Sequence, residues 1–281
     1  MYKLTMGKRL SIYLPDNVEI ERILERLSTL ASESGQSRNS HAVKALLDYI
    51  DTKAIADPGV ERALSVLEGS IDLHLDLARE AWGAYHGLFY EMDLLVSAAL
   101  NRSLSNLRAF CSLTRGSNFM ASAILLRCQI DNILRLSAAW LVGDHREYIT
   151  KMIEGVPVNQ LKDREGHRLT DAFLCKSLAK KYPWIQDVYT HTCGYVHLSE
   201  KHMFQTHRAQ TGGKMETTIG ESDKYVTNEL RIEAINAFTA STRLLFDYVA
   251  GWIQAKTDPA DPEVLEEKKR IMSEYPGRES G

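Results

Sequence analysis

The residues best suited to chemistry lie in the stretch 189–202, YTHTCGYVHLSEKH, which is rich in titratable and hydroxyl groups. Tyr189, Cys193 and His197 recur at intervals of four residues and would share one face of a helix. His197 titrates near neutral pH, so it could serve as an acid, a base or a ligand, with the phenol of Tyr195 nearby. The same side chains could instead hold helices together through hydrogen bonds, and both roles stay open.

A second charged group lies in 121–143, ASAILLRCQIDNILRLSAAWLVG. Arg127 and Asp131 are four residues apart, as are Asp131 and Arg135, so either pair can form along one helix face. The rest of this helix is apolar nearly all round, so part of the charged stripe should be buried and paired. Arg127 and Asp131 therefore join Tyr189, Tyr195 and His197 as a candidate polar site, with a structural ion pair as the alternative.

Metal and cofactor chemistry has little support in the sequence. Four residues that could bind zinc fall in the first stretch: His191, Cys193, His197 and His202. Their spacing matches no recognised structural zinc pattern, so we expect no metal site. The sequence has no Walker-type loop, GxSxG elbow or HExxH motif, so we expect no cofactor. The polar loop LKDREGHRLTD, with Asp163, Glu165 and His167, could cover a site, but solvated charge explains it equally well.

Composition indicates a soluble globular protein. The 281 residues are 44% hydrophobic and 25% charged, and the net charge is −3, so any nucleic-acid surface must be local. The four cysteines are widely spaced, which predicts reduced thiols filling the core of a cytoplasmic protein. The sequence starts without the apolar region of a signal peptide, and its most apolar stretch is too short to span a bilayer, so we expect no membrane association.

These residues must be positioned by long helices, because the chain after residue 59 is nearly free of strand patterns. We predict helices at 60–82, 84–114, 118–142, 145–154, 169–181, 184–203 and 224–256. A hairpin or loop is expected at 206–222, where Gly212-Gly213 separates short β-prone runs. The predicted organisation is a module at 1–53, a linker at 54–59 (AIADPG), a helical bundle at 60–256 and a charged tail at 257–281.

The first 53 residues have a different pattern. In KRLSIYLP, Leu10, Ile12 and Leu14 alternate with Arg9, Ser11 and Tyr13, which predicts a strand that ends at Pro15. We found no second strand pattern nearby to pair with it. Two amphipathic helices should follow, the first beginning near Asp16 and the second near Ser37. So short a module cannot bury a stable core alone.

This segment resembles the ribbon-helix-helix family of Arc/MetJ-type DNA-binding proteins, through RLSIYLP and through GQSRNSHAVKALLDYI at the start of the second helix. The resemblance implies that two chains pair their strands into one antiparallel ribbon, which enters the DNA major groove. By the same resemblance, the base-reading positions are Arg9, Ser11 and Tyr13. The positions that hold a phosphate at the start of the second helix are Ser37, Arg38 and Asn39.

The region 85–250 resembles an uncharacterised class of bacterial all-helical domains, through LLRCQID and CGYVHLS. Such domains are likened to the HEPN superfamily, which includes metal-independent ribonucleases of toxin and phage-defence systems. The catalytic signature of those ribonucleases is an arginine followed at short spacing by a histidine. Arg79 and His86 match it, although they lie early in the bundle, where the family's motif is usually late.

The sequence therefore predicts a mainly α protein: a dimeric ribbon-helix-helix module followed by a helical bundle with one small hairpin. The expected function is sequence-specific binding of double-stranded DNA by a homodimer or higher oligomer that regulates transcription. The helical domain would then sense a ligand or partner, or add assembly contacts. The alternative is a HEPN-like ribonuclease acting on RNA, in which the first module serves for dimerisation or autoregulation.

Overall fold

The computed structural model describes residues 2–6, 10–14, 29, 32, 57–209, 211, 213–220 and 222–257. The chain divides into two compact units, Met1–Asp57 and Pro58–Gly281, and the division falls within the predicted linker. The described part of the chain is mainly helical, as the sequence predicts. Within that part, no helix is both long and apolar enough to cross a membrane.

In the first unit, the structure contains an antiparallel hairpin of β1 (Tyr2–Met6) and β2 (Leu10–Leu14). Strand β2 is the predicted strand, but the expectation that it has no nearby partner is wrong. The residues YKLTM also alternate polar with apolar types, and their short length hid this pattern. The two predicted helices of this unit fall outside the described residues, apart from Thr29 and Ser32, and strand pairing with a second copy stays a prediction.

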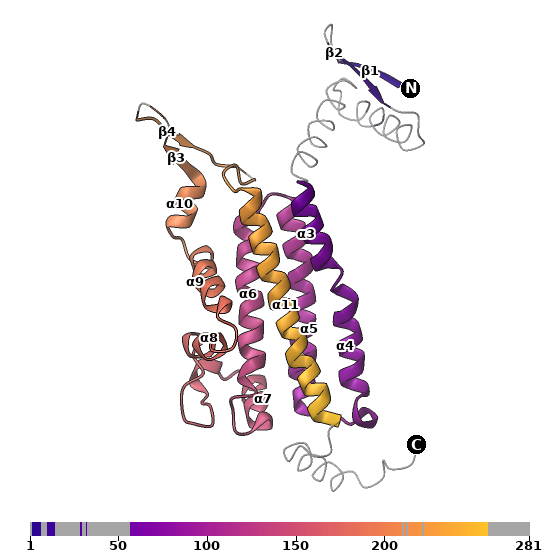
Figure 1. The fold of residues 1–281 in the computed structure, drawn as a ribbon, viewed down its shortest axis with the longest axis vertical. Helices are drawn as coiled ribbons and strands as arrows, with labels where there is room; N and C mark the ends of the chain where they lie inside the picture. Colours follow the sequence, from indigo (N-terminus) through magenta and orange to yellow (C-terminus); the bar gives the residue numbers. More distant parts are fainter. Residues whose placement is uncertain are drawn as a thin grey trace. The chain divides into compact units, whose positions relative to one another are not determined.

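The second unit is a helical bundle (Figure 1). Its helices are α3 (Pro58–Glu68), α4 (Ile71–Gly83), α5 (Glu91–Arg115), α6 (Phe119–Ala138), α7 (His145–Ile153), α8 (Asp171–Ala179), α9 (Trp184–Val196), α10 (Glu200–Thr206) and α11 (Asn228–Thr257). Helices α3, α4, α5, α6 and α11 form the body of the bundle, and α8 and α9 pack on α6. The predicted hairpin is also present, as β3 (His207–Ala209) paired with β4 (Met215–Thr217).

Two predicted helices are each divided in the structure. The helix predicted at 60–82 breaks after Glu68, where the carbonyl of Leu67 accepts hydrogen bonds from both the N–H and the hydroxyl of Ser70. The helix predicted at 184–203 breaks at His197, whose backbone is extended. The helix predicted to begin at residue 84 begins instead at Glu91, after a short 3-10 turn. Helical periodicity continues across such breaks, so it does not locate them.

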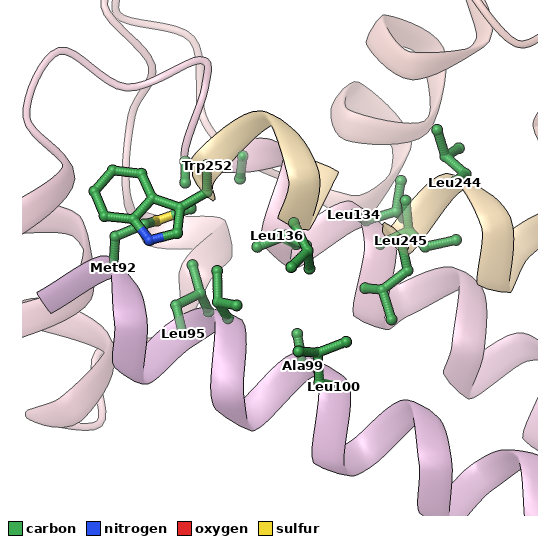
Figure 2. Packing of buried hydrophobic residues seen from close by; sticks show 14 of the residues in the cluster. Met92, Leu95, Ala99, Leu100, Leu134, Leu136, Leu244, Leu245 and Trp252 are labelled. Atoms are coloured by element: carbon green, nitrogen blue, oxygen red, sulfur yellow. The ribbon is translucent and has the colours of Figure 1, made fainter. Parts of the chain in front are cut away.

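The main core lies between α5, α6 and α11 (Figure 2). Leu100 of α5, Leu136 of α6 and Leu245 of α11 are among its fully or almost fully buried side chains. Burial of such a side chain stabilises the fold by roughly 1.5–3 kcal/mol. All three helices are needed to exclude water from this layer, so it fixes how their polar residues face one another.

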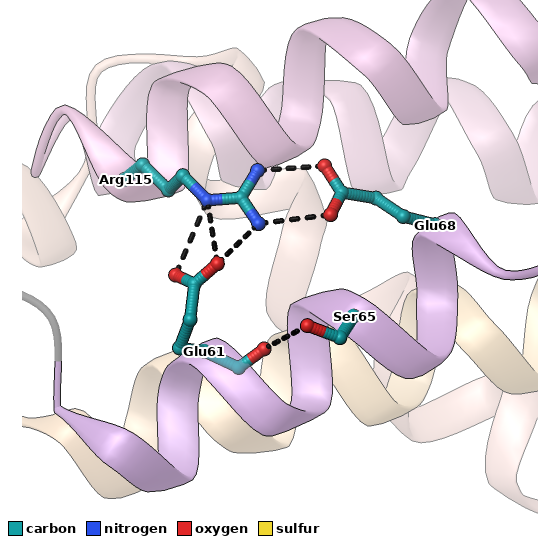
Figure 3. Close-up of polar contacts among 4 residues, drawn as sticks. All are labelled: Glu61, Ser65, Glu68 and Arg115. Atoms are coloured by element: carbon teal, nitrogen blue, oxygen red, sulfur yellow. Dashed lines mark hydrogen bonds and ion pairs between the residues drawn. The ribbon is translucent and has the colours of Figure 1, made fainter.

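Helix α3 is attached to α5 by a charged clamp (Figure 3). The guanidinium of Arg115 donates to the carboxylate of Glu61, and its two terminal nitrogens donate to both oxygens of Glu68 at 2.6 and 2.8 Å. Hydrogen bonds to the arginine lower the pKa of Glu68 and outweigh the opposing effect of burial. The bidentate geometry holds α3 in one register against α5.

Candidate functional site

The candidate polar site is centred on Arg127 of α6, whose side chain is 9% exposed. Arg127 donates a hydrogen bond to Asp131, one turn along the same helix, as the sequence predicted. Its guanidinium also lies 3.6 Å from Asp171 of α8 and stacks 4.0 Å from the ring centre of Tyr189 on α9. Three of the five predicted residues, Arg127, Asp131 and Tyr189, therefore meet where α6, α8 and α9 pack.

Two further residues complete this group. Arg135, which was expected to pair with Asp131, instead donates to Asp171. The side chain of Asp171 therefore lies between two arginines of α6, and it holds this place because Thr170 caps α8 immediately before it. We call Arg127, Asp131, Arg135, Asp171 and Tyr189 the Arg127 cluster.

The Arg127 cluster suits attachment of helices better than catalysis. Its two arginines and two aspartates balance in charge, and each carboxylate already accepts from an arginine. Burial lowers the pKa of Arg127, but the hydrogen bonds to Asp131 and Cys193 outweigh it, so the pKa is raised overall. Burial raises the pKa of Tyr189 above its ordinary value, so this phenol stays neutral near pH 7. The cluster therefore presents neither a general base nor a reactive nucleophile.

Tyr195 and His197, the other two predicted residues, lie outside the Arg127 cluster. Tyr195 packs edge-on against Phe119, with ring centres 5.6 Å apart, and its hydroxyl accepts a hydrogen bond from Gln205. His197 is exposed at the end of α9. The prediction that these two residues join Arg127 in one site is not supported by these placements.

Much of the motif around His197 has a structural role at the corner between α9 and α10. The Ser199 hydroxyl donates to the carbonyl of Gly194 at 2.7 Å and accepts from the N–H of Lys201. In return, the N–H of Ser199 donates to the ring of His202 at 3.2 Å. A side chain on Gly194 would meet Lys201 at 2.8 Å, so the glycine permits this tight corner.

The two residues that match the ribonuclease signature are both exposed. Arg79 lies on α4, where it forms an ion pair with Asp76, and its side chain is 73% exposed. His86 lies in the turn after α4, with a positive φ of 59°. Within the described residues, the printed polar contact of Arg79 is this surface pair, which does not direct it toward a substrate site.

The polar loop 161–171 closes on itself. Asp163 accepts hydrogen bonds from the backbone N–H groups of Glu165 and His167 and from the ring of His167. The acidic and histidine groups of these three residues lie within 4.8 Å of one another, as a metal site would require. However, the N–H donors already use both oxygens of Asp163, so loop closure explains the arrangement without an ion.

A cavity of about 470 Å³ lies between α7 and this loop. Lys151 and Lys162 line it together with Asp144 and Glu147, so it contains charges of both signs. Arg164, which also lines it, donates to the carbonyls of Trp140 and Val142 at 3.0 and 3.1 Å and so caps the end of α6. The balanced charge selects no particular class of ligand.

The predicted DNA-binding residues belong to the first unit. Ser11 and Tyr13 are alternate residues of β2, which places them on one face of the strand. The remaining residues predicted to bind DNA fall outside the described part of the chain: Arg9, Ser37, Arg38 and Asn39. Contact of any of these residues with DNA stays a prediction.

Sequence reasoning missed two buried polar networks. Lys256 and Asp93 form an ion pair at 2.9 Å with both side chains fully buried. His74 is buried between α4 and α5, where its ring is 2.9 Å from the hydroxyl of Ser103. Each residue lies on an amphipathic helix, and a polar residue within the apolar stripe was the signal that could have identified it.

The chain matches no known protein family by its sequence, and comparisons with curated proteins and with solved structures also gave no match.

Proposed function

We propose that the chain is a sequence-specific DNA-binding dimer that regulates transcription, with DNA contacted by the first unit. The observation that carries this proposal is strand β2, in which Ser11 and Tyr13 alternate with Leu10, Ile12 and Leu14. A ribbon with one polar and one apolar face can pack on a core and still present side chains to a major groove. The strand also belongs to a unit that is compact apart from the helices.

The helical unit is assigned to sensing or assembly rather than catalysis. The Arg127 cluster supports this assignment, because its charges are paired with one another and hold α8 on α6. Ribonuclease activity has less support, since His197 is exposed away from Arg127 and Arg79 forms a surface ion pair. The alternative is retained only as an outcome of the experiment below.

Fluorescence anisotropy of the full chain on DNA from upstream of its own gene tests the proposal, with scrambled DNA of the same length as reference. Arg9→Ala should reduce binding of the upstream DNA by roughly tenfold and relax discrimination, because arginine is the best reader of guanine. Lys53→Ala removes the same charge elsewhere in the unit and should have little effect. Equal, weak binding of both DNAs, unchanged by Arg9→Ala, would overturn the proposal and make RNA cleavage the next assay.

A further inference from the structure

The hairpin adds a second strand to the surface proposed to face DNA. In its register, Lys3 lies opposite Tyr13 and Thr5 opposite Ser11. Residues directly opposite in an antiparallel pair share a face of the sheet. The face that carries the proposed readers therefore continues onto β1, where Lys3 is the one charged residue of YKLTM. The other register pairs bring apolar types together: Leu4 with Ile12, and Met6 with Leu10.

Pairing of two copies through β2 would place β1 on the outside. Among the described residues, β2 is paired along one edge with β1, and the second edge of a strand offers another row of donors and acceptors. A two-stranded hairpin by itself is marginally stable in water, whereas a larger sheet with an apolar face is stable. A dimer through the second edge of β2 gives a sheet of four strands in the order β1-β2-β2-β1.

The width of that sheet decides where Lys3 would meet DNA. Adjacent strands lie about 4.8 Å apart, so the outer strands would be about 14 Å apart. The major groove is about 12 Å wide and admits two central strands. The outer strands must then lie over the groove walls, which are formed by the phosphates.

From this register we propose that Lys3 of each protomer binds a backbone phosphate from the outer strand, while β2 occupies the groove. Lysine suits this position because its ammonium is a point charge that binds phosphate without reading a base. The inference rests on the proposed function, and it adds a role to β1 that the single-strand ribbon does not have.

The test measures binding of the full chain to the upstream and scrambled DNAs between about 50 and 200 mM salt, for the parent protein, Lys3→Gln, Lys3→Arg and Lys53→Gln. Each neutralised phosphate adds about 0.9 to the slope of log affinity against log salt. Loss of Lys3 from both protomers should therefore lower the slope by about 1.8. Across this fourfold salt range, the parent protein should lose about tenfold more affinity than Lys3→Gln.

Support requires this change of slope on both DNAs, with an unchanged ratio of their affinities, and recovery of the slope in Lys3→Arg. The proposal is overturned if Lys3→Gln behaves as Lys53→Gln does, because β1 then lies away from the phosphates. A changed affinity ratio would also overturn it, since Lys3 would then read bases inside the groove. Failure of the parent protein to bind either DNA would instead refute the proposed function itself, and the role of Lys3 with it.

Discussion

Lys256 carries its charge at a fully buried position near the end of α11. Its ammonium donates to Asp93 at 2.9 Å and to the carbonyl of Ala81 at 2.8 Å. The indole of Trp252 and the N–H of Tyr90 donate to the same carboxylate. The buried charges are thus satisfied by one another and by neighbouring groups from α4, α5 and α11, as burial requires.

Removal of one partner should be costly, because the other charge stays buried. We expect Lys256→Met to lower the free energy of unfolding by about 3–5 kcal/mol, measured by urea denaturation. Lys256→Met combined with Asp93→Asn should recover more than about 1 kcal/mol, since no charge is then left unpaired. Lys176→Met, on the exposed side of α8, is the control and should change stability by less than about 0.5 kcal/mol. Equal loss in the single and double variants would contradict this account.

His74 links four helices through neutral hydrogen bonds. One ring nitrogen must donate to the carbonyl of Ser70 at 2.9 Å, so the other accepts from the hydroxyl of Ser103. The amide of Gln129 donates in turn to Ser103 at 2.8 Å, and the ring packs edge-on against Phe246 of α11. Burial lowers the pKa of His74, because this environment disfavours the imidazolium.

The lowered pKa of His74 predicts loss of stability in mild acid. Below a pH of about 6.5 the unfolded chain takes up a proton that the folded chain does not, so stability falls as the pH falls. The contribution reaches at most about 1.4 kcal/mol per pH unit. Urea denaturation at several pH values should show the difference in stability between the parent protein and His74→Gln shrinking from pH 7.5 to 5.5. His191→Gln, at an exposed position, should show no such narrowing, and a constant difference for His74→Gln would refute the prediction.

At the scale of elements, α8 is held to α6 by Asp171, which receives Arg135 and lies 3.6 Å from Arg127. These contacts connect an element of the outer layer to the central helix of the bundle. The side chain of Asp171 is 34% exposed, so solvent weakens each pair and the stabilisation should be moderate.

We expect Asp171→Asn to loosen α8 and α9 without unfolding the bundle, at a cost of about 1 kcal/mol. Hydrogen exchange followed by mass spectrometry should show faster exchange of the amides in 171–196, while those of α5 and α11 keep their protection. Asp187→Asn makes the same change at an exposed position in the first turn of α9 and should leave exchange unaltered. Uniformly faster exchange throughout the bundle would show that Asp171 stabilises the whole unit instead.

For the whole molecule, the two compact units predict that the helical unit folds without the first. Its two hydrophobic clusters are built from residues between Val60 and Ile253, so they do not require the first 57 residues. A chain of residues 58–257 should unfold cooperatively, with a melting midpoint within about 5 °C of the helical transition in the full protein, measured by circular dichroism. A fragment without cooperative unfolding would show that the first unit completes the core.

The position of most helices could be predicted from local patterns, whereas their ends could not. Repeated apolar residues at three- and four-residue spacing locate α5, α6 and α11. The corner at His197 was missed because Tyr195 and Met203 continue a helical spacing across it, although Ser199 and His202 cap a new helix there. Within the candidate site, sequence spacing brought Arg127, Asp131 and Tyr189 together correctly but also included His197, which lies outside the cluster.

The sequence by itself determined the features that depend on neighbouring residues. These are the mainly helical class, the strand at Leu10–Leu14, the hairpin of β3 and β4, and the pair of Arg127 with Asp131 one helical turn away. Only the tertiary structure decided that Asp171 would meet Arg135, or that Lys256 would meet Asp93 from 163 residues away. Partners on different helices are chosen by how whole helices pack, and that packing depends on the combined shape of many side chains rather than on any local spacing.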